Sequence, residues 1–215
     1  MIFRYDAIIF DFDGVLVESV KEKTWAFVEL YRPYGEQVMR EVAAYHEAHG
    51  GVSRFEKFRY FHRTLLGREL GAAEEGQLAS RFSALVEDAV VAAPWVAGAR
   101  EFLVAYHDQL PLHIASATPD TELRRIVSRR GMQTFFRSVA GTPETKSEII
   151  RRIIAEQGYS SWRILMLGDA TADMEGAIDA DVPFLGRVPK GAGNPFPANI
   201  QTIEDLEHLA ECIRG

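Results

Sequence analysis

The chain has 215 residues, of which 47% are hydrophobic and 26% are charged, a composition that excludes a disordered or collagen-like protein. Its 24 basic and 31 acidic side chains give a net charge of −7, which does not support a broad nucleic-acid surface but leaves room for a local cationic pocket. A single cysteine, Cys212, excludes a disulfide within the chain and a cysteine-rich zinc site.

The N-terminal segment carries acids inside a short apolar run, which is typical of a buried strand and not of a secretion signal. Elsewhere the sequence has no stretch of about 18 uninterrupted apolar residues, the minimum for a membrane-spanning helix. We therefore expect a soluble, cytoplasmic protein that does not contact a membrane. The sequence says nothing about the oligomeric state.

Short apolar runs alternate with helical patterns along most of the chain. The runs predict strands at residues 5–10, 112–115, 138–140, 164–167 and 182–185. The helical patterns predict helices at residues 98–107, 119–130, 146–157, 172–180 and 203–213. This alternation is typical of βαβ units, so the predicted fold class is α/β with a parallel sheet.

One stretch breaks the alternation. From about residue 20 to residue 92 the sequence shows amphipathic helical patterns and no convincing strand, with breaks at Arg32-Pro33, Gly50-Gly51 and 67–71. We therefore predict two domains: a sheet-containing core formed by residues 1–19 and 93–215, and an all-helical insertion formed by residues 20–92.

Carboxylates follow two of the predicted strands. Asp11 and Asp13 follow the first strand, Asp169 follows the run at 164–167, and Asp173 lies one helical turn later. Open parallel sheets bind ligands at the carboxyl ends of their strands, so we expect these four acids to converge. Their mutual repulsion favours a hard divalent cation with oxygen ligands, and the sequence therefore predicts a Mg²⁺ site.

Two further positions suit an anion. Ser116 follows the second strand, and we interpret Thr118 as the N-cap of the next helix with Pro119 at its first position. Lys146 opens another helix inside a Thr145–Glu148 capping box, where its charge opposes the helix dipole. A bound anion or the carboxylate cluster would explain a lysine at that position.

The insertion has a similar pattern after Gly50-Gly51. Ser53 and Glu56 fit a second capping box, and Arg54 and Lys57 share one face of the helix that follows. Both cations could form an anion clamp, or they could belong to a solvated basic face. Phenylalanines on another face predict core packing, and the three histidines of the insertion fit no metal motif, so we expect surface or helix-packing roles for His46, His49 and His62.

Taken together, these motifs resemble the haloacid dehalogenase superfamily, in its branch of phosphoglycolate phosphatases and β-phosphoglucomutases with a helical cap. The matching pieces are DFDGVL at 11–16, Ser116, Lys146 and GDATAD at 168–173, in the expected order. The resemblance covers essentially the whole chain. It implies a Rossmann-like core, a helical cap that closes over the substrate, and a Mg²⁺-dependent phosphatase that acts on a small phosphorylated metabolite.

The resemblance also implies roles for individual residues. Asp11 would be the nucleophile that forms an aspartyl-phosphate, and Asp13 the general acid and then the general base. Ser116 and the backbone at Ala117 would bind the phosphoryl group, and Lys146 would hold it beside Asp11.

For the metal, the resemblance implies Asp169, with help from Asp173, beside the carboxylate of Asp11 and the backbone carbonyl of Asp13. Arg54 and Lys57 of the cap would bind the rest of the substrate, for which phosphoglycolate and sugar phosphates are the leading possibilities.

Three alternatives stay open at this stage. The first is a phosphomutase, and the second is a phosphonate hydrolase that would use Lys21, Lys23 or Lys57 to form a Schiff base. The third, a catalytically idle binding module, is disfavoured because every acid of the motif is present. The sequence departs from the family pattern at Ala117, where asparagine is frequent, and at Asp181, where glycine is expected.

Overall fold

The computed structural model describes residues 3–215 of the chain. Six strands form one sheet in the order β3-β2-β1-β4-β5-β6, and every neighbouring pair is parallel. The first strand of the chain is therefore central, and the strand order reverses direction beside it, between β1 and β4. The strands are β1 (Ala7–Phe10), β2 (Leu112–Pro119), β3 (Ser138–Thr142), β4 (Ile164–Gly168), β5 (Phe184–Arg187) and β6 (Thr202–Ile203).

Helices cover both faces of this sheet, because alternate residues of a strand point to opposite sides. Ile8 and Phe10 of β1 belong to the larger apolar core, with α5 (Ala99–Tyr106), α6 (Asp120–Arg129) and the short α9 (Leu209–Cys212). Ala7 and Ile9 belong to a second core, with α7 (Lys146–Gln157) and α8 (Thr171–Asp179). The predicted α/β class with a parallel sheet is confirmed.

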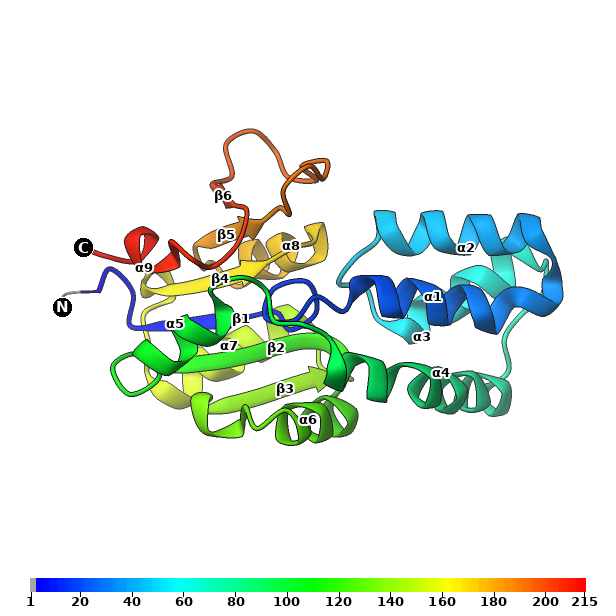
Figure 1. Cartoon of the computed structure of the whole chain (residues 1–215), viewed down its shortest axis with the longest axis horizontal. Helices are drawn as coiled ribbons and strands as arrows, with labels where there is room; N and C mark the ends of the chain where they lie inside the picture. The colour runs from blue at the N-terminus through cyan, green and yellow to red at the C-terminus, as the bar shows by residue number, and fades with distance from the viewer. Residues whose placement is uncertain (1–2) are drawn as a thin grey trace.

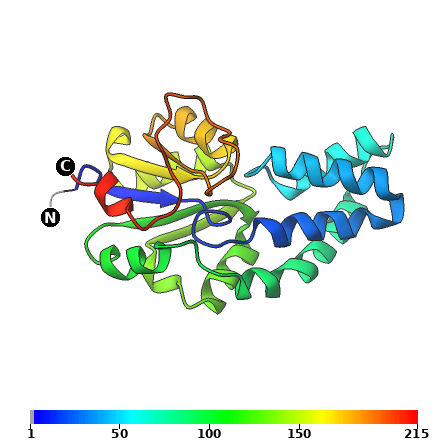
Figure 2. The same ribbon diagram turned by 45° about the horizontal axis from the view of Figure 1, so that its top comes forward.

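Four further helices form a separate layer beyond the sheet (Figure 1). Figures 1 and 2 both show this layer at one end of the molecule, with the two chain termini at the other end. Its apolar residues include a cluster of buried phenylalanines, Phe27, Phe58, Phe61 and Phe82. The helices are α1 (Val20–Tyr31), α2 (Glu36–Ala48), α3 (Arg54–Tyr60) and α4 (Ala72–Ala92), with a 3-10 turn at Arg32–Tyr34 and a π-helical turn at Phe61–Leu65.

Two chain segments connect the helical layer to the sheet, and they run side by side. Val17 forms an antiparallel bridge with Trp95, and the Glu18 amide donates to the Pro94 carbonyl at 2.9 Å. Buried Arg187 of β5 fixes the first segment, because it donates to the Gly14 carbonyl at 3.0 Å and pairs with Glu18. The loop after β1 therefore has a defined path from the sheet to α1.

Three details of the sequence interpretation are wrong. Residues 203–213 do not form one helix, because Gly186 and Val188 donate to the carbonyls of Gln201 and Ile203 and pair this segment with β5; only Leu209–Cys212 is helical. Thr118 is not an N-cap, since β2 continues to Pro119 and α6 begins at Asp120.

The third detail concerns the start of α3. The Ser53 hydroxyl accepts from the Phe55 amide at 3.3 Å, one residue earlier than a capping box with Glu56 requires.

Within residues 3–215, no helix is both long and apolar enough to cross a membrane.

Candidate active site

Three of the four acids predicted to converge do so, at the carboxyl ends of the two central strands. Asp11 follows β1 and Asp169 follows β4, which are parallel neighbours, and Asp173 lies in the first turn of α8. Carboxylate oxygens of these three residues all lie within 4.8 Å of one another. Gly168 makes room for this arrangement, since a Cβ at that position would lie 2.2 Å from the Cβ of Asp173.

Burial and like charge perturb these acids strongly. Burial is the main cause that raises the pKa of Asp11 to about 7, and the charges of Asp173 and Asp13 add to it. Burial also raises the pKa of Asp169 well above its ordinary value, together with the charges of Asp11 and Asp173. Burial and mutual repulsion therefore both disfavour the ionised forms of Asp11 and Asp169.

Lys146 is the cation that faces this cluster. The capping box of Thr145 and Glu148 is present, as predicted, and it starts α7 so that Lys146 points inward. Its ammonium pairs with Asp173 and lies 3.1 Å from Asp11 Oδ2. Burial alone would lower the pKa of Lys146, but the carboxylates of Asp11 and Asp173 outweigh it and raise the pKa. Lys146 is therefore charged and fixed beside Asp11.

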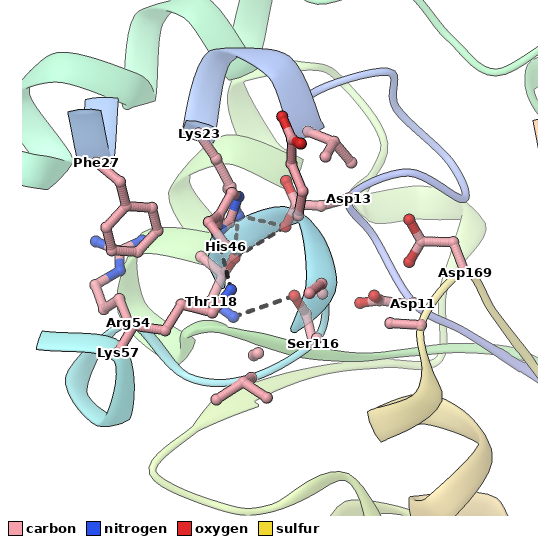
Figure 3. Close-up of a pocket in the computed structure, with 18 of the residues that line it drawn as sticks. Asp11, Asp13, Lys23, Phe27, His46, Arg54, Lys57, Ser116, Thr118 and Asp169 are labelled. Atoms are coloured by element: carbon pink, nitrogen blue, oxygen red, sulfur yellow. Dashed lines mark hydrogen bonds and ion pairs between the residues drawn. The ribbon is translucent and has the colours of Figure 1, made fainter. Parts of the chain in front are cut away.

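The carboxylate of Asp13 points away from Asp11 and Asp169 (Figure 3) and is not part of the group of three acids. It accepts from Ser19 Oγ at 2.6 Å, from Thr118 Oγ1 at 3.1 Å and from the Lys23 ammonium. Burial would raise its pKa, but Lys23 and the two hydroxyls together lower it. Of the four acids predicted as metal ligands, the structure thus groups the side chains of three and leaves Asp13 with a different set of neighbours.

Ser116 and Ala117 lie near the end of β2. Both line a cavity of about 150 Å³ that also contacts Asp11, Asp13 and Asp169. The Ser116 hydroxyl is buried and accepts from the Thr118 amide at 3.2 Å. A hydroxyl group and backbone amides therefore border the space in front of Asp11.

Helices of the insertion form the far end of this cavity. Lys57 is 2% exposed, and its Nζ lies 2.8 Å from Nδ1 of His46. Burial lowers the pKa of Lys57 to about 7, helped by the charges of Lys23 and Lys146. Burial likewise lowers the pKa of His46 to about 3, so His46 is neutral and can accept a hydrogen bond from Lys57.

Arg54 also lines the cavity but already has a partner. Its guanidinium donates to both carboxylate oxygens of Glu122, at 2.6 and 2.9 Å, and lies over the ring of Phe82. Two cations were predicted to form an anion clamp. In the structure, Arg54 is ion-paired with a carboxylate of the sheet domain, whereas the Lys57 ammonium has a histidine as its hydrogen-bonding partner and lies over the Phe27 ring.

The sequence interpretation missed three residues of this site. Lys23 was considered only as a possible Schiff-base lysine, Thr118 was assigned to a helix cap, and His46 was expected to serve packing. The available signal for Lys23 was its position in the first turn of the first helix after the acid loop. No comparable signal existed for His46, because its contact with Lys57 depends on how α2 packs against α3.

The clustered acids fit a hard divalent cation. They supply only oxygen atoms, they lie close enough together to share one ion, and both burial and their mutual repulsion oppose their ionisation, which a bound cation would favour. Asp11 and Asp169 are the residues best placed to hold the ion. Asp173 would assist, although one of its oxygens accepts from Lys146 and the other from the Ala170 amide at 3.0 Å.

Comparisons with known proteins agree with this geometry. Residues 5–181 match the model of the haloacid dehalogenase-like hydrolases. A phosphoglycolate phosphatase of Synechococcus elongatus is 25% identical over 177 residues, which cover 80% of this chain and 78% of the relative.

Solved structures show the same fold. A predicted phosphoglycolate phosphatase from Haemophilus somnus matches with a TM-score of 0.75 at 16% identity, over 97% of this chain and 98% of that one. CbbY from Rhodobacter sphaeroides in complex with xylulose 1,5-bisphosphate matches with a TM-score of 0.74 at 16% identity, over 95% of this chain and 96% of that one.

Proposed function

The chain belongs to the haloacid dehalogenase-like hydrolases and is a phosphatase of that family, and we propose that it hydrolyses a small phosphorylated metabolite through an aspartyl-phosphate on Asp11. The observation that carries the proposal is the pairing of one buried carboxylate, Asp11, with the Lys146 ammonium at 3.1 Å. A carboxylate is a weak nucleophile toward an anionic ester, and an adjacent cation reduces the repulsion between them.

In the first step, an Asp11 carboxylate oxygen attacks the phosphorus atom and the ester P–O bond breaks. The phosphoryl group is transferred to Asp11, and the leaving oxygen takes a proton from Asp13, which must gain that proton when the substrate binds because its pKa is lowered in the free enzyme. Ser116 and the backbone amides beyond it lie where they can donate to the phosphoryl oxygens as the group moves. Lys146 stays beside both partners and offsets the charge that develops there.

In the second step, Asp13 takes a proton from a water molecule, whose oxygen attacks phosphorus. The bond between phosphorus and the Asp11 oxygen breaks, phosphate is released, and both aspartates return to their starting state. A positioned acid and base of this kind contributes roughly 10²–10⁴-fold to a rate. A Mg²⁺ ion bound by Asp11 and Asp169, and assisted by Asp173 and the Asp13 carbonyl, would supply charge neutralisation at the phosphoryl group.

The helical insertion, residues 20–92, acts in this proposal as a cap over the substrate. The cavity between cap and sheet measures about 150 Å³, a volume that suits a small ligand. Lys57 at its cap end favours a leaving group that carries negative charge. These features support a phosphorylated short-chain acid such as phosphoglycolate over a larger sugar phosphate.

The test is an Asp11→Asn variant assayed with p-nitrophenyl phosphate and with phosphoglycolate. We expect turnover of both to fall at least 10³-fold while the circular dichroism spectrum stays unchanged. Asp6→Asn is the matched control, because Asp6 precedes β1, at the end opposite Asp11, and pairs with Arg163. Substantial residual activity in Asp11→Asn would overturn the assignment of the nucleophile.

A further inference from the structure

Arg54 and Lys57 lie in one helix and line the same cavity, but only Arg54 is paired with a carboxylate. Arg54 and Glu122 form a two-bond ion pair in which each side chain is only 4% exposed. Lys57 has no carboxylate within ion-pair distance in the part of the chain described, residues 3–215, and its polar neighbour is neutral His46. Lys57 is therefore the uncompensated charge at the cap end of the cavity.

Glu122 comes from the sheet domain and is held in place by three elements. It lies in the first turn of α6, which directly follows the strand that carries Ser116. It accepts from Arg54 of α3 and from the Ser83 hydroxyl of α4, and the Phe82 ring packs 4.4 Å from the Arg54 guanidinium carbon. Both carboxylate oxygens are satisfied, so the pair is fixed without any ligand.

This pairing has a chemical consequence for the substrate. The planar fork of a guanidinium binds a phosphoryl group or a carboxylate through two parallel hydrogen bonds, and Glu122 already occupies that fork. A second phosphoryl group at the cap end would have to displace Glu122 or lie beside its negative charge. A leaving group with a single negative charge needs only Lys57.

We propose that Glu122 is a specificity-determining residue, which neutralises Arg54 and thereby excludes substrates with a second phosphoryl group at the cap end of the cavity. The inference rests on the proposed phosphatase function and adds to it a choice between substrates. It also separates this chain from an enzyme that must bind a bisphosphate at the same place.

The experiment compares two probes with three-carbon chains. One is 3-hydroxypropanoate phosphate, which ends in a carboxylate, and the other is propane-1,3-diol bisphosphate, which ends in a second phosphoryl group. In Glu122→Gln, we expect the ratio of kcat/KM for the bisphosphate to that for the carboxylate to rise about tenfold or more, the scale of one charge-assisted hydrogen bond. A ratio that stays at the wild-type value would overturn the proposal.

Further variants separate charge from structural support. The double variant Arg54→Gln, Glu122→Gln has the same net charge as the wild type, so its ratio should stay within about threefold of the wild-type value. If both variants instead lose activity on both probes equally, Glu122 only supports the structure and the proposal is wrong. Glu87→Gln is the matched control, because Glu87 joins α4 to α6 through Arg125 and Arg129 outside the cavity.

Two more measurements keep the test decisive. If Glu122→Gln does not fold, Arg54→Gln leaves the Glu122 charge without its partner, and the ratio should then fall below that of the wild type; no change would contradict the proposal. If the wild type hydrolyses neither probe, the proposed function is at fault. Discrimination between the two probes is then measured by calorimetric titration of each probe into the wild type and into Glu122→Gln. If the ratio of the two affinities is the same in both proteins, the proposal about Glu122 is wrong.

Discussion

Lys23 of the helical insertion donates to the carboxylate of Asp13 and, at 2.8 Å, to Thr118 Oγ1 of the sheet domain. The residue proposed as acid and base is thus held partly by the cap and partly by the sheet. Any movement of α1 away from the sheet would separate Lys23 from Asp13 and Thr118. In the proposed mechanism, closure of the cap would therefore be linked to placement of the acid through one side chain.

Replacing Lys23 tests this link. In Lys23→Met, Asp13 loses one of the groups that orient it, so we expect kcat for an alkyl phosphate to fall roughly 10²-fold. With p-nitrophenyl phosphate the loss should be below about tenfold, because that leaving group departs without a proton. Initial rates on both substrates check the prediction, and exposed Lys21→Met on the same helix turn is the control. Equal losses on both substrates would contradict it.

Gly51 provides a second test of how closely the cap approaches the site. Its backbone has φ of +72°, and a Cβ there would lie 3.2 Å from both Lys146 Nζ and the Cβ of Ala172. We expect Gly51→Ala to lower kcat/KM for phosphoglycolate at least tenfold, because the cap can no longer settle against Lys146.

Gly67→Ala is the matched control for backbone strain. Gly67 also has a positive φ, of +65°, but its added Cβ would meet no atom within 4 Å. Both variants should therefore lose a similar free energy of unfolding, about 1 kcal/mol, as judged by urea denaturation. Only Gly51→Ala should lose activity. If Gly67→Ala loses a comparable activity, the loss in Gly51→Ala results from a less stable cap and not from the contact with Lys146.

Much of the sheet domain could be predicted because its signals are local. Asp11 and Asp169 each end a short apolar strand, and the alternation of strands and helices brings the ends of parallel strands to one edge. The Thr145 capping box fixed the start of α7 in the same way, from residues within one turn. These features depend on neighbours in sequence, which a single chain displays.

The contacts between cap and sheet could not be predicted, because they join residues far apart in the sequence. Lys23 and Thr118 are separated by 95 positions, and Arg54 and Glu122 by 68. A pattern along the chain shows that Arg54 is basic but not that a carboxylate already faces it. Specificity follows from such pairings, so the reaction class was more predictable than the choice of substrate.

The departure at Asp181 has a backbone explanation. Its φ is +56°, in the left-handed region where glycine is the usual residue, and its amide donates to the Ile178 carbonyl at the end of α8. Aspartate is one of the few other residues that tolerate this conformation. The turn before β5 is therefore kept without glycine, and the difference lies outside the site.

Mg²⁺ and the Asp169 side chain should affect stability in opposite ways. The folded protein penalises ionised Asp169, whose pKa is raised by burial and by Asp11 and Asp173, and this penalty is full at pH values above the raised pKa. At alkaline pH without metal, Asp169→Asn should therefore unfold at a higher temperature than the wild type.

Adding Mg²⁺ should make the wild type unfold at a higher temperature than Asp169→Asn. An ion that binds only the folded wild type stabilises it by about 2.7 kcal/mol at 100 times its Kd, and the variant lacks a ligand for it. Thermal unfolding with EDTA and with excess Mg²⁺ checks both signs, and EDTA should also abolish phosphate release until Mg²⁺ is restored. If Mg²⁺ shifts the Tm of both proteins equally, Asp169 is not a metal ligand.

Lys57 should make substrate binding depend on pH. Burial lowers its pKa from 10.5 to about 7, with help from the charges of Lys23 and Lys146, so the free enzyme loses the Lys57 charge as the pH rises above 7. For phosphoglycolate we expect KM to be lowest below pH 7 and to rise up to about tenfold per pH unit above it, because the bound anion prefers the charged amine. Lys57→Arg stays charged and should keep KM nearly constant, while Lys57→Met should have a high KM throughout.

The same lowered pKa fixes the sign of a stability effect. Between about pH 7 and pH 10.5 the unfolded chain binds a proton at Lys57 that the folded protein lacks, so this residue makes the protein more stable as the pH rises through that window. The cost of burying the charge is full below pH 7. Lys57→Met should therefore unfold at a higher urea concentration than the wild type at pH 6, and the difference should shrink by pH 10. A difference that stays constant with pH would show that Lys57 keeps an ordinary pKa in the folded protein.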